Sequence, residues 1–296
     1  MKVGVVSLVG RPNAGKSTLL NSIIKEKVAI TSDKPQTTRN NIQGIYNDND
    51  SQIIFVDTPG IHKPKNKLGK FLNRESYSSL EGIDLVLFML DASTPLGKGD
   101  EFILDKIKEE NVNTFLILNK VDKIKKDELF NLILNYKDKY DFKEIIPISA
   151  LKEKNIDELL KTVKEYLEDG ERIYPEDLYT DKSIRFLISE LIREKVLRKT
   201  REEVPHAVTV VLENYEEKKE AVIINAAIIV ERDGIKKILV GHNGEMIKDI
   251  GTSARKDIEN LVGKRVYLDL FVKTVNNWRD RDKYLVEFGF DENNFE

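Results

Sequence analysis

The sequence contains no cysteine among its 296 residues. This excludes a disulfide-stapled scaffold, a thiolate zinc site and a cysteine nucleophile, and it is typical of a reducing compartment. Only three histidines occur, His62, His206 and His242, and their wide spacing argues against a multi-histidine metal site. No apolar run reaches the roughly 18 residues of a membrane-spanning helix. The apolar stretch at residues 2–10 is short and lacks a small-residue cleavage site, so we expect a cytoplasmic protein without a signal peptide.

The sequence also lacks an excess of basic residues. It has 48 basic and 51 acidic residues and a net charge of −3, so any binding to nucleic acid must depend on local patches. Apolar residues make up 40% of the chain, which is enough to build a core. The length suggests about two domains.

The hydrophobic pattern changes along the chain. Residues 1–168 alternate apolar runs with amphipathic stretches, which predicts βαβ units and an α/β fold with a doubly wound, mostly parallel sheet. The expected strands are Lys2–Leu8, Gln52–Asp57, Leu85–Asp91, Thr114–Asn119 and Glu144–Ile148, and the expected helices are Ser17–Ile24, Asp100–Glu109, Lys126–Tyr140 and Ile156–Leu167. The charged stretch 169–182, with Gly and Pro, indicates a linker, and residues 183–296 indicate an α+β domain.

Residues 10–17 read Gly-Arg-Pro-Asn-Ala-Gly-Lys-Ser, which fits the phosphate-binding pattern Gly-x4-Gly-Lys-Ser/Thr. The glycines let the backbone approach phosphate oxygens, and the following helix adds the positive end of its dipole. Lys16 can reach the β- and γ-phosphates, and the Ser17 hydroxyl can ligate Mg²⁺. An expected strand precedes the loop, which argues against a chance glycine-rich turn. The predicted phosphate-binding residues are Asn13, Ala14, Gly15, Lys16, Ser17, Thr18 and, from the segment described next, Gly60.

Asp57-Thr58-Pro59-Gly60 directly follows an expected strand. Ligands of open α/β sheets bind at the carboxyl ends of the strands, so Asp57 can reach Mg²⁺ through water and the Gly60 N–H can meet the γ-phosphate. In isolation these four residues are equally typical of a plain turn. Their position after a phosphate loop favours the nucleotide role.

Asn119-Lys120-Val121-Asp122 ends another apolar strand. The Asp122 carboxylate can accept hydrogen bonds from N1–H and the exocyclic amine of guanine, whereas adenine presents an acceptor at N1 and lacks the amine. Asn119 can tie the base to the loop, and the Lys120 stem can cover the ring. Alone, this segment could be a surface turn. After the two earlier motifs it predicts a guanine site made by Asn119, Lys120, Asp122 and, after the last strand, Ser149, Ala150 and Leu151, with the Ala150 N–H on guanine O6.

A threonine-rich segment, residues 36–40, lies between the first helix and the second strand. A threonine here can ligate Mg²⁺ through its hydroxyl and contact the γ-phosphate through its N–H, and it should be ordered only with the triphosphate bound. A polar loop is the alternative. We choose Thr38 over Thr37, so the predicted Mg²⁺ ligands are Ser17, Thr38 and, through water, Asp57. The predicted switch residues are Gln36, Thr37, Thr38, Arg39, Asp57, Thr58, Pro59, Gly60 and Ile61.

These five elements, in order and spacing, resemble the translation-factor-related class of P-loop GTPases with a Ras-like G domain. The Thr-Thr-Arg and Asp-Thr-Pro-Gly segments narrow the resemblance to the bacterial ribosome-assembly and RNA-modification GTPases. Ile61 stands where Ras-like GTPases carry a water-orienting glutamine, so we expect slow intrinsic GTP hydrolysis. Asn13 matches an asparagine that binds K⁺ in related GTPases, and the resemblance therefore implies a K⁺ site.

Residues 61–74 are rich in basic side chains and contain no acid. They follow the Asp-Thr-Pro-Gly turn, so they are expected to move with the nucleotide state. A solvated basic loop and a nucleotide-gated contact to RNA phosphate are both open. The basic residues are Lys63, Lys65, Lys67, Lys70 and Arg74.

Gly241-His242-Asn243-Gly244 lies between two helical patterns. Such a loop lets an RNA backbone approach closely, and Ile238, Leu239, Ile247 and Ile250 could form a floor for bases. A helix-turn-helix corner is an equally good reading of the loop alone. The element order helix, strand, strand, helix, loop, helix, strand resembles a type II KH domain, which implies binding of single-stranded RNA. The implied RNA-binding residues are Ile238, Gly241, His242, Asn243, Gly244, Ile247, Lys248 and Arg255.

The pair between the two glycines lacks the lysine or arginine that KH loops usually carry, so the phosphate grip could shift to Lys248, Arg255 and Lys256. A second basic group ends the first helix of this domain. It could be a solvated helix end favoured by the dipole or an RNA contact. Its members are Arg193, Lys195, Arg198, Lys199 and Arg201.

A GTPase domain followed by one type II KH domain resembles the Era family of bacterial GTPases over essentially the whole chain. Residues 254–259 and 277–279 also match its pattern. The resemblance implies a GTP/GDP switch that requires Mg²⁺ and binds the 3′ end of 16S ribosomal RNA more tightly in the GTP state. It also implies a role in maturation of the small (30S) ribosomal subunit and peripheral association with the cytoplasmic face of the inner membrane.

Parts of the sequence are also compatible with two other functions. A GTPase of the tRNA-modification type would act with a partner enzyme, but relatives of that type usually carry extra catalytic segments or a C-terminal cysteine. An interaction module with a vestigial phosphate loop is disfavoured by the intact Lys16, Ser17, Asp57 and Asp122.

Overall fold

The computed structural model describes residues 1–60, 64, 66–78, 82–137 and 139–290. Its contacts divide the chain into two compact units. The N-terminal unit comprises Met1–Thr31, Thr38–Lys63 and Leu72–Asp181. The C-terminal unit comprises Lys182–Glu296 together with two short segments, Ser32–Thr37 and Pro64–Phe71. Ile61, His62, Lys63 and Lys65 lie outside the described residues, so the expectations placed on them stay predictions.

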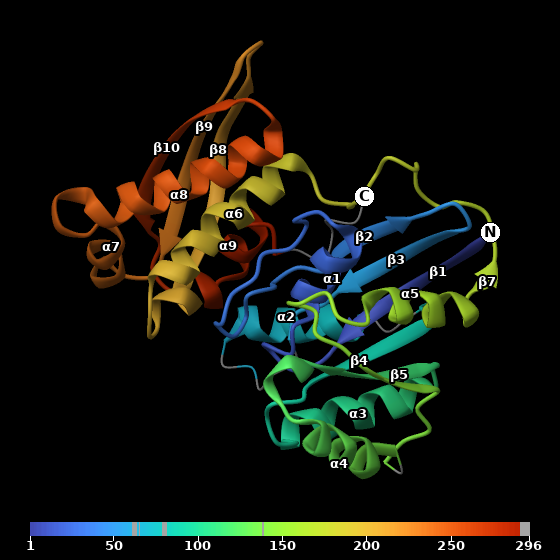
Figure 1. The fold of residues 1–296 in the computed structure, drawn as a ribbon. Helices are drawn as coiled ribbons and strands as arrows, with labels where there is room; N and C mark the ends of the chain where they lie inside the picture. The colour runs from blue at the N-terminus through green and yellow to red at the C-terminus, as the bar shows by residue number, and fades with distance from the viewer. Residues whose placement is uncertain (61–63, 65, 79–81, 138, 291–296) are drawn as a thin grey trace. The chain divides into compact units, whose positions relative to one another are not determined.

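The N-terminal unit is built on a sheet of seven strands (Figure 1). The strand order is β2-β3-β1-β4-β5-β6, and β7 pairs with β1. Strands β3, β1, β4, β5 and β6 are parallel neighbours, whereas β2 is antiparallel to β3 and β7 is antiparallel to β1. The bounds are β1 Lys2–Val9, β2 Ile42–Asn47, β3 Ser51–Asp57, β4 Leu85–Asp91, β5 Thr114–Asn119, β6 Glu144–Pro147 and β7 Glu168–Asp169. The predicted doubly wound, mostly parallel α/β fold is confirmed.

Helices connect these strands and bury apolar faces against the sheet. Val86 and Phe88 of β4 and Leu116 of β5 pack with Ile103 and Ile107 of α3 in one cluster. The bounds are α1 Lys16–Ile24, α2 Lys67–Ser78, α3 Lys98–Glu110, α4 Lys126–Lys137 and α5 Ile156–Glu165. The continuous apolar runs bury these strands in the sheet. Because the parallel strands have their carboxyl ends at the same edge, the loops that follow them lie close together there.

Three segments differ from the sequence-based expectation. Strand β2 was not predicted, and residues 67–74, expected as part of a loop, belong to helix α2, in which Leu68 and Leu72 are buried one turn apart. The stretch 169–182 was expected as a linker, but residues up to Asp181 belong to the N-terminal unit and are hydrogen-bonded within it. The Gln52 side-chain oxygen accepts from the backbone N–H groups of Ile173 and Tyr174 at 2.7 and 2.9 Å. A buried glutamine therefore holds this stretch.

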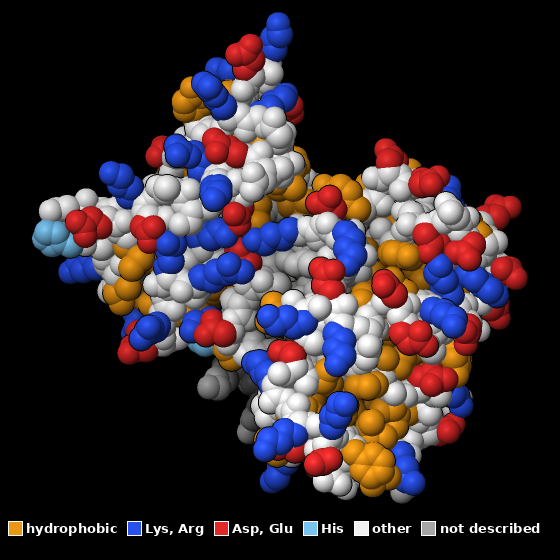
Figure 2. Space-filling model, viewed as in Figure 1, with side chains coloured by type: hydrophobic (Ala, Val, Ile, Leu, Met, Phe, Trp, Pro, Cys, Tyr) orange, Lys and Arg blue, Asp and Glu red, His pale blue; other side chains and the backbone are white. Residues whose placement is uncertain are grey.

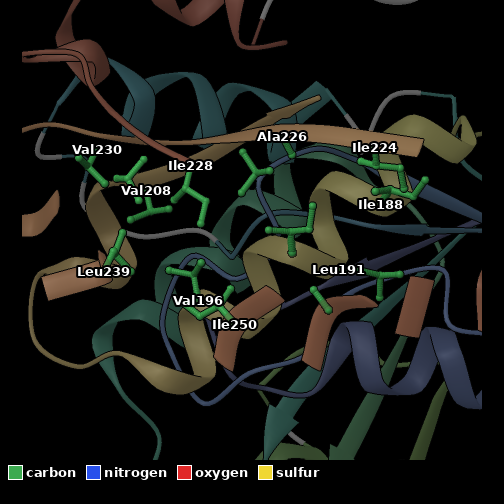
Figure 3. Packing of buried hydrophobic residues seen from close by; sticks show 14 of the residues in the cluster. Ile188, Leu191, Val196, Val208, Ile224, Ala226, Ile228, Val230, Leu239 and Ile250 are labelled. Carbon is green, nitrogen blue, oxygen red and sulfur yellow. The ribbon is translucent and has the colours of Figure 1, made fainter. Parts of the chain in front are cut away.

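The C-terminal unit packs three helices on a three-stranded sheet of order β10-β9-β8. β9 is parallel to β10 and antiparallel to β8. Figure 3 shows the core, where Ile188 and Leu191 of α6, Leu239 of α7 and Ile250 of α8 meet the apolar residues of β8 and β9. The bounds are α6 Ile184–Lys199, β8 Val208–Glu217, β9 Ala221–Val230, α7 Asp233–Val240, α8 Glu245–Val262, β10 Arg265–Thr274 and α9 Asp282–Glu287. The predicted order of elements and the KH-type α+β fold are confirmed.

Two general features complete the fold. On the face shown in Figure 2, acidic and basic side chains are interspersed, in keeping with the small net charge of −3. None of the helices in the described part of the chain combines the length and the hydropathy needed to cross a bilayer.

Candidate functional site

The phosphate loop runs from the end of β1 to the start of α1. Gly15 has φ of 101°, a conformation that L side chains rarely adopt, and a Cβ there would lie 2.2 Å from the Asn119 side-chain nitrogen. The Lys16 ammonium donates to the carbonyls of Gly10 and Arg11 at 3.0 and 3.2 Å. Burial lowers the pKa of Lys16 to about 8, and the nearby Asp57 carboxylate opposes this shift. A phosphate anion would meet a desolvated cation here.

The three residues predicted to ligate Mg²⁺ converge, although they come from α1, the loop before β2 and the end of β3. The Ser17 hydroxyl donates to Asp57 Oδ2 at 2.5 Å, and Thr38 Oγ1 donates to the same oxygen at 3.2 Å. The two hydroxyl oxygens lie 2.8 Å apart. Three hard oxygen donors therefore share one small volume beside the phosphate loop.

The second carboxylate oxygen of Asp57 tests whether this group suits a metal ion. Asp57 is fully buried, and its Oδ1 has no hydrogen-bond partner within the described structure. Burial raises the pKa of Asp57, against the opposing effects of Lys16, Ser17 and Thr38. A hydrated Mg²⁺ would satisfy this orphaned oxygen, and the donor set of hydroxyls and carboxylate fits that ion. Within the described ranges, no cluster of three His, Asp or Glu side chains offers another site.

The side chains of the two threonines point to different partners. Thr37 Oγ1 donates to the Lys34 carbonyl at 2.6 Å and lies 2.7 Å from Ser32 Oγ, so it stabilises its own loop. Thr38 is 7% exposed and faces Ser17 and Asp57. The geometry therefore distinguishes two residues that sequence spacing left nearly equivalent.

The Asp57–Gly60 segment is held on both sides. The Thr58 hydroxyl donates to the Leu8 carbonyl of β1 at 2.9 Å, and the Ser76 hydroxyl of α2 donates to the Pro59 carbonyl at 2.7 Å. A movement of the Asp57–Gly60 segment would therefore disturb its hydrogen bond to Ser76 of α2.

Asn119 joins the predicted base-binding loops to the phosphate loop. Its side-chain nitrogen donates to the Ala14 carbonyl at 2.8 Å, and its oxygen accepts from the N–H groups of Lys120 and Ala150 at 2.8 and 3.0 Å. The Asn119 side chain is nearly fully buried, so these hydrogen bonds satisfy polar atoms that water does not reach. The ends of β5 and β6 are thus fixed against the start of α1.

Asp122, the carboxylate predicted to bind guanine, is exposed and its anionic form is stabilised. Ser149 Oγ donates to Asp122 Oδ1 at 2.5 Å, and this hydrogen bond is the main cause that lowers the pKa of Asp122. The carboxylate is then ionised at neutral pH, as acceptance from N1–H and the exocyclic amine requires. Leu151 is 71% exposed beside the buried Ala150.

A groove lies between α8 and β10, next to the Gly241–Gly244 loop. It has a volume of about 330 Å³ and is lined by Ile247, Lys248, Gly251, Thr252 and Arg255 of α8 and by Leu268 and Leu270 of β10. The loop itself needs glycine, because Gly241 and Gly244 have φ of 73° and 80°. Ile238 on α7 is half exposed. Ile247, Lys248 and Arg255, three of the predicted RNA-binding residues, line this groove together.

One expectation for this unit was wrong, and a second holds only for part of its residues. Leu239 and Ile250 do not form a floor for bases, because both are fully buried in the core. The basic group at the end of α6 is only partly solvated: Arg198 and Arg201 are exposed, whereas the other members are paired with acids. Arg193 and Lys195 are buried in ion pairs, with Glu190 and with Glu194 and Asp257, and Lys199 pairs with Asp249 at 2.6 Å. Alternating acids at helical spacing on α6 and α8 could have indicated this neutralisation.

Sequence reasoning missed several residues at both sites. Leu268 and Leu270 line the groove from β10, and no sequence signal distinguishes them from other apolar strand residues. Lys67, expected in a free basic loop, pairs with Asp282 at 2.6 Å. At the nucleotide site, Asp91 contacts Lys120, and its position at the carboxyl end of an apolar strand was a signal that could have found it.

Comparisons with known proteins agree with this geometry. Residues 5–120 match the family model described as 50S ribosome-binding GTPase, and residues 203–279 match the KH domain model. One similar solved structure is that of an Era variant from Aquifex aeolicus bound to GDP and AlF4⁻. It is 43% identical with a TM-score of 0.95, over 98% of this chain and 99% of that chain. Era in complex with MgGDPNP and nucleotides 1506–1542 of 16S ribosomal RNA is similar to the same extent, with 43% identity and a TM-score of 0.95.

Proposed function

The chain belongs to the Era family of GTPases, and from this premise we propose that it is a GTP-hydrolysing, RNA-binding switch that binds the 3′ end of 16S ribosomal RNA and assists maturation of the 30S subunit. The observation that carries the nucleotide part is the convergence of Ser17, Thr38 and Asp57 beside the phosphate loop. The RNA part is supported by the α8–β10 groove and by the RNA complex of the similar Era structure.

In the proposed GTP complex each element has one task. The Lys16 ammonium binds the β- and γ-phosphates, and Ser17 and Thr38 ligate Mg²⁺ while Asp57 contacts it through water. When bound, Mg²⁺ neutralises negative charge on the phosphate oxygens. Asp122 reads the guanine edge. The Ala150 N–H donates to Asn119 Oδ1 at 3.0 Å, so contact with guanine O6 requires that this N–H be shared or released. The remaining phosphate contacts are backbone N–H groups of Asn13, Ala14, Gly15 and Thr18, and of Gly60 at the γ-phosphate.

The hydrolytic step is water attack on the γ-phosphate, with GDP and phosphate as products. An isoleucine follows Gly60, and a hydrocarbon side chain cannot polarise the attacking water. Catalysis then depends on charge stabilisation by Lys16 and by a second cation, which we place at Asn13 as K⁺. Slow intrinsic turnover suits a switch, because the lifetime of the GTP state sets how long the RNA is held.

The RNA strand is proposed to lie along the α8–β10 groove. The glycines of the 241–244 loop allow close approach of the backbone, and bases pack on Ile247, Leu268 and Leu270. Lys248 and Arg255 supply positive charge along the same helix, which compensates for the absence of a basic residue between the two glycines.

The test measures binding of the full chain to a short RNA copying the 3′ end of 16S ribosomal RNA. The RNA is titrated with protein in GDPNP and in GDP at fixed salt, because phosphate contacts make affinity strongly salt-dependent. A scrambled RNA of the same length and composition is the control. Tighter, sequence-dependent binding in GDPNP is expected. Equal affinity for both RNAs, or in both nucleotides, would overturn the proposed switch while leaving the family assignment intact.

A further inference from the structure

The Lys120 side chain is held at its charged end by two partners that sequence reasoning did not connect. Its ammonium donates to the Asn13 carbonyl in the phosphate loop at 2.7 Å and to Asp91 Oδ2 at 2.6 Å. The Asp91 and Lys120 side chains are 17% and 24% exposed, so the pair is largely shielded from water. One ammonium thus links the base-binding loop, the phosphate loop and the end of β4.

The strand register explains why Asp91 is in reach. Residues Asp91 and Asn119 are partners in the parallel pairing of β4 with β5, and the Ala92 N–H donates to the Asn119 carbonyl at 2.8 Å. Lys120 follows directly and has φ of 64°, which turns the chain at the end of β5. The residue that ends β4 and the residue after β5 are therefore neighbours by construction of the sheet.

Asp91 is itself fixed before Lys120 reaches it. Its Oδ1 accepts from the Ser93 N–H at 2.9 Å and from the Ser93 hydroxyl at 2.6 Å, which leaves Oδ2 for the ammonium. Although burial raises it, hydrogen bonds from Lys120 and Ser93 keep the pKa of Asp91 below its usual range. Because Ser93 already fixes the Asp91 carboxylate, the ion pair with Lys120 forms with little further loss of side-chain freedom at Asp91.

We propose that Asp91 is a positioning residue for nucleotide binding, which holds the Lys120 stem extended across the place where guanine lies. This inference rests on the proposed guanine-nucleotide function. A lysine side chain loses rotamer freedom when it is ordered, and this loss opposes binding. Because the ion pair with Asp91 orders Lys120 before the ligand arrives, the nucleotide does not meet that cost on binding. The same contact keeps the Asn13 carbonyl in place, so base and phosphate sites are preorganised together.

The test uses Asp91→Asn, which is nearly isosteric. The amide oxygen can still accept from Ser93, whereas the amide nitrogen is a donor facing the Lys120 ammonium. The matched control is Ser93→Ala, which removes the hydroxyl contact to the Asp91 carboxylate and leaves both the Ser93 N–H contact and the ion pair. Dissociation constants for GDP and GDPNP are measured for both variants, for Lys120→Ala and for the Asp91→Asn/Lys120→Ala double variant.

For Asp91→Asn we expect the dissociation constants of both nucleotides to rise about fivefold, the effect of a partly exposed ion pair. The KM for GTP should rise with them, whereas kcat at saturating GTP should stay unchanged, because the contact is remote from the γ-phosphate. Asp91→Asn should have no further effect in the Lys120→Ala background. Ser93→Ala should bind as the wild type does.

The outcomes separate the inference from the function beneath it. If the wild-type chain binds GDP but Asp91→Asn has unchanged affinity, the inference is overturned alone. Additive losses in the double variant, or an equal loss in Ser93→Ala, would assign Asp91 a merely structural role and also overturn it. Failure of the wild-type chain to bind GDP would overturn the proposed function and the inference together.

Discussion

Replacing Gly251 by alanine should stabilise the protein and weaken RNA binding at the same time. Gly251 lies inside α8 and lines the groove between α8 and β10. A Cβ at this position would meet the Leu270 side chain at 3.4 Å, which is ordinary van der Waals contact. The fold can therefore accept the methyl group, but the groove floor loses the space that the glycine leaves open.

The gain in stability and the loss of RNA affinity have separate physical causes. A glycine in a helix interior costs about 0.5–1 kcal/mol relative to alanine, so the free energy of unfolding should rise by that amount. A base stacked or packed on a protein surface contributes roughly 1–3 kcal/mol, and displacing one base from the groove should weaken RNA binding by at least about fivefold. Gly251→Leu should weaken it further, because the longer side chain fills more of the groove.

The assay pairs thermal unfolding with a titration of labelled 16S 3′-end RNA in the presence of GDPNP. Gly234→Ala is the matched control, since Gly234 lies in α7 and a Cβ there would have no atom within 4 Å. Gly234 is the second residue of α7 rather than an interior one, so this variant should gain less stability, and its RNA affinity should be unchanged. If Gly251→Ala is stabilised and still binds RNA as the wild type does, the groove is not where the RNA lies. Unchanged GDP binding in both variants would confirm that the N-terminal unit is intact.

Further predictions concern the nucleotide site. Asp57→Asn should raise by about tenfold the Mg²⁺ concentration needed for half-maximal GTP binding, because the variant cannot offer an anionic oxygen to the ion's water shell. The measurement is a titration of Mg²⁺ in the presence of a fluorescent GTP analogue. Affinity for GDP should fall as the pH rises through 8, since burial lowers the pKa of Lys16 to about 8 and phosphate binds only its charged form. The measurement is calorimetry at pH values below that at which guanine loses its N1 proton, and a flat profile would contradict it. Potassium should stimulate GTP hydrolysis and sodium should not, at matched ionic strength in a phosphate-release assay. Asn13→Ala should abolish the difference between the hydrolysis rates in potassium and in sodium. Equal rates in the two salts for the wild type would contradict the proposed K⁺ site.

The fold could be predicted from the sequence where strands are buried on both faces. β4 and β5 read as continuous apolar runs, and their predicted bounds match the observed ones. β2 was missed because it is an edge strand in which polar Gln43 and Asn47 interrupt the apolar pattern. Helix α2 was hidden by its lysines, although Leu68 and Leu72 recur at helical spacing.

The site was predictable where its residues lie in short motifs, and not where tertiary contacts bring distant residues together. Ser17 lies in the first turn of α1, and Asp57 and Asn119 end β3 and β5, so each motif specifies the position of its residue. The contact between Asp91 and Lys120 spans 29 residues and depends on which strand lies beside β5. Likewise, Leu268 and Leu270 line the RNA groove only because β10 packs beside α8.

The strand order itself explains the layout of the nucleotide site. Read across the sheet as β3, β1, β4, β5 and β6, the strands β3, β4 and β5 end in Asp57, Asp91 and Asn119, whereas β1 leads into the phosphate loop and β6 is followed closely by Ser149. These ends carry, in the same order, the proposed metal contact, the phosphate contacts and the base contacts, so the ligand would lie along one edge of the sheet. β4 is the strand between the phosphate loop and the base loops. A residue at its carboxyl end is therefore placed to join the two halves of the site, which is what Asp91 does by binding the lysine that also contacts Asn13.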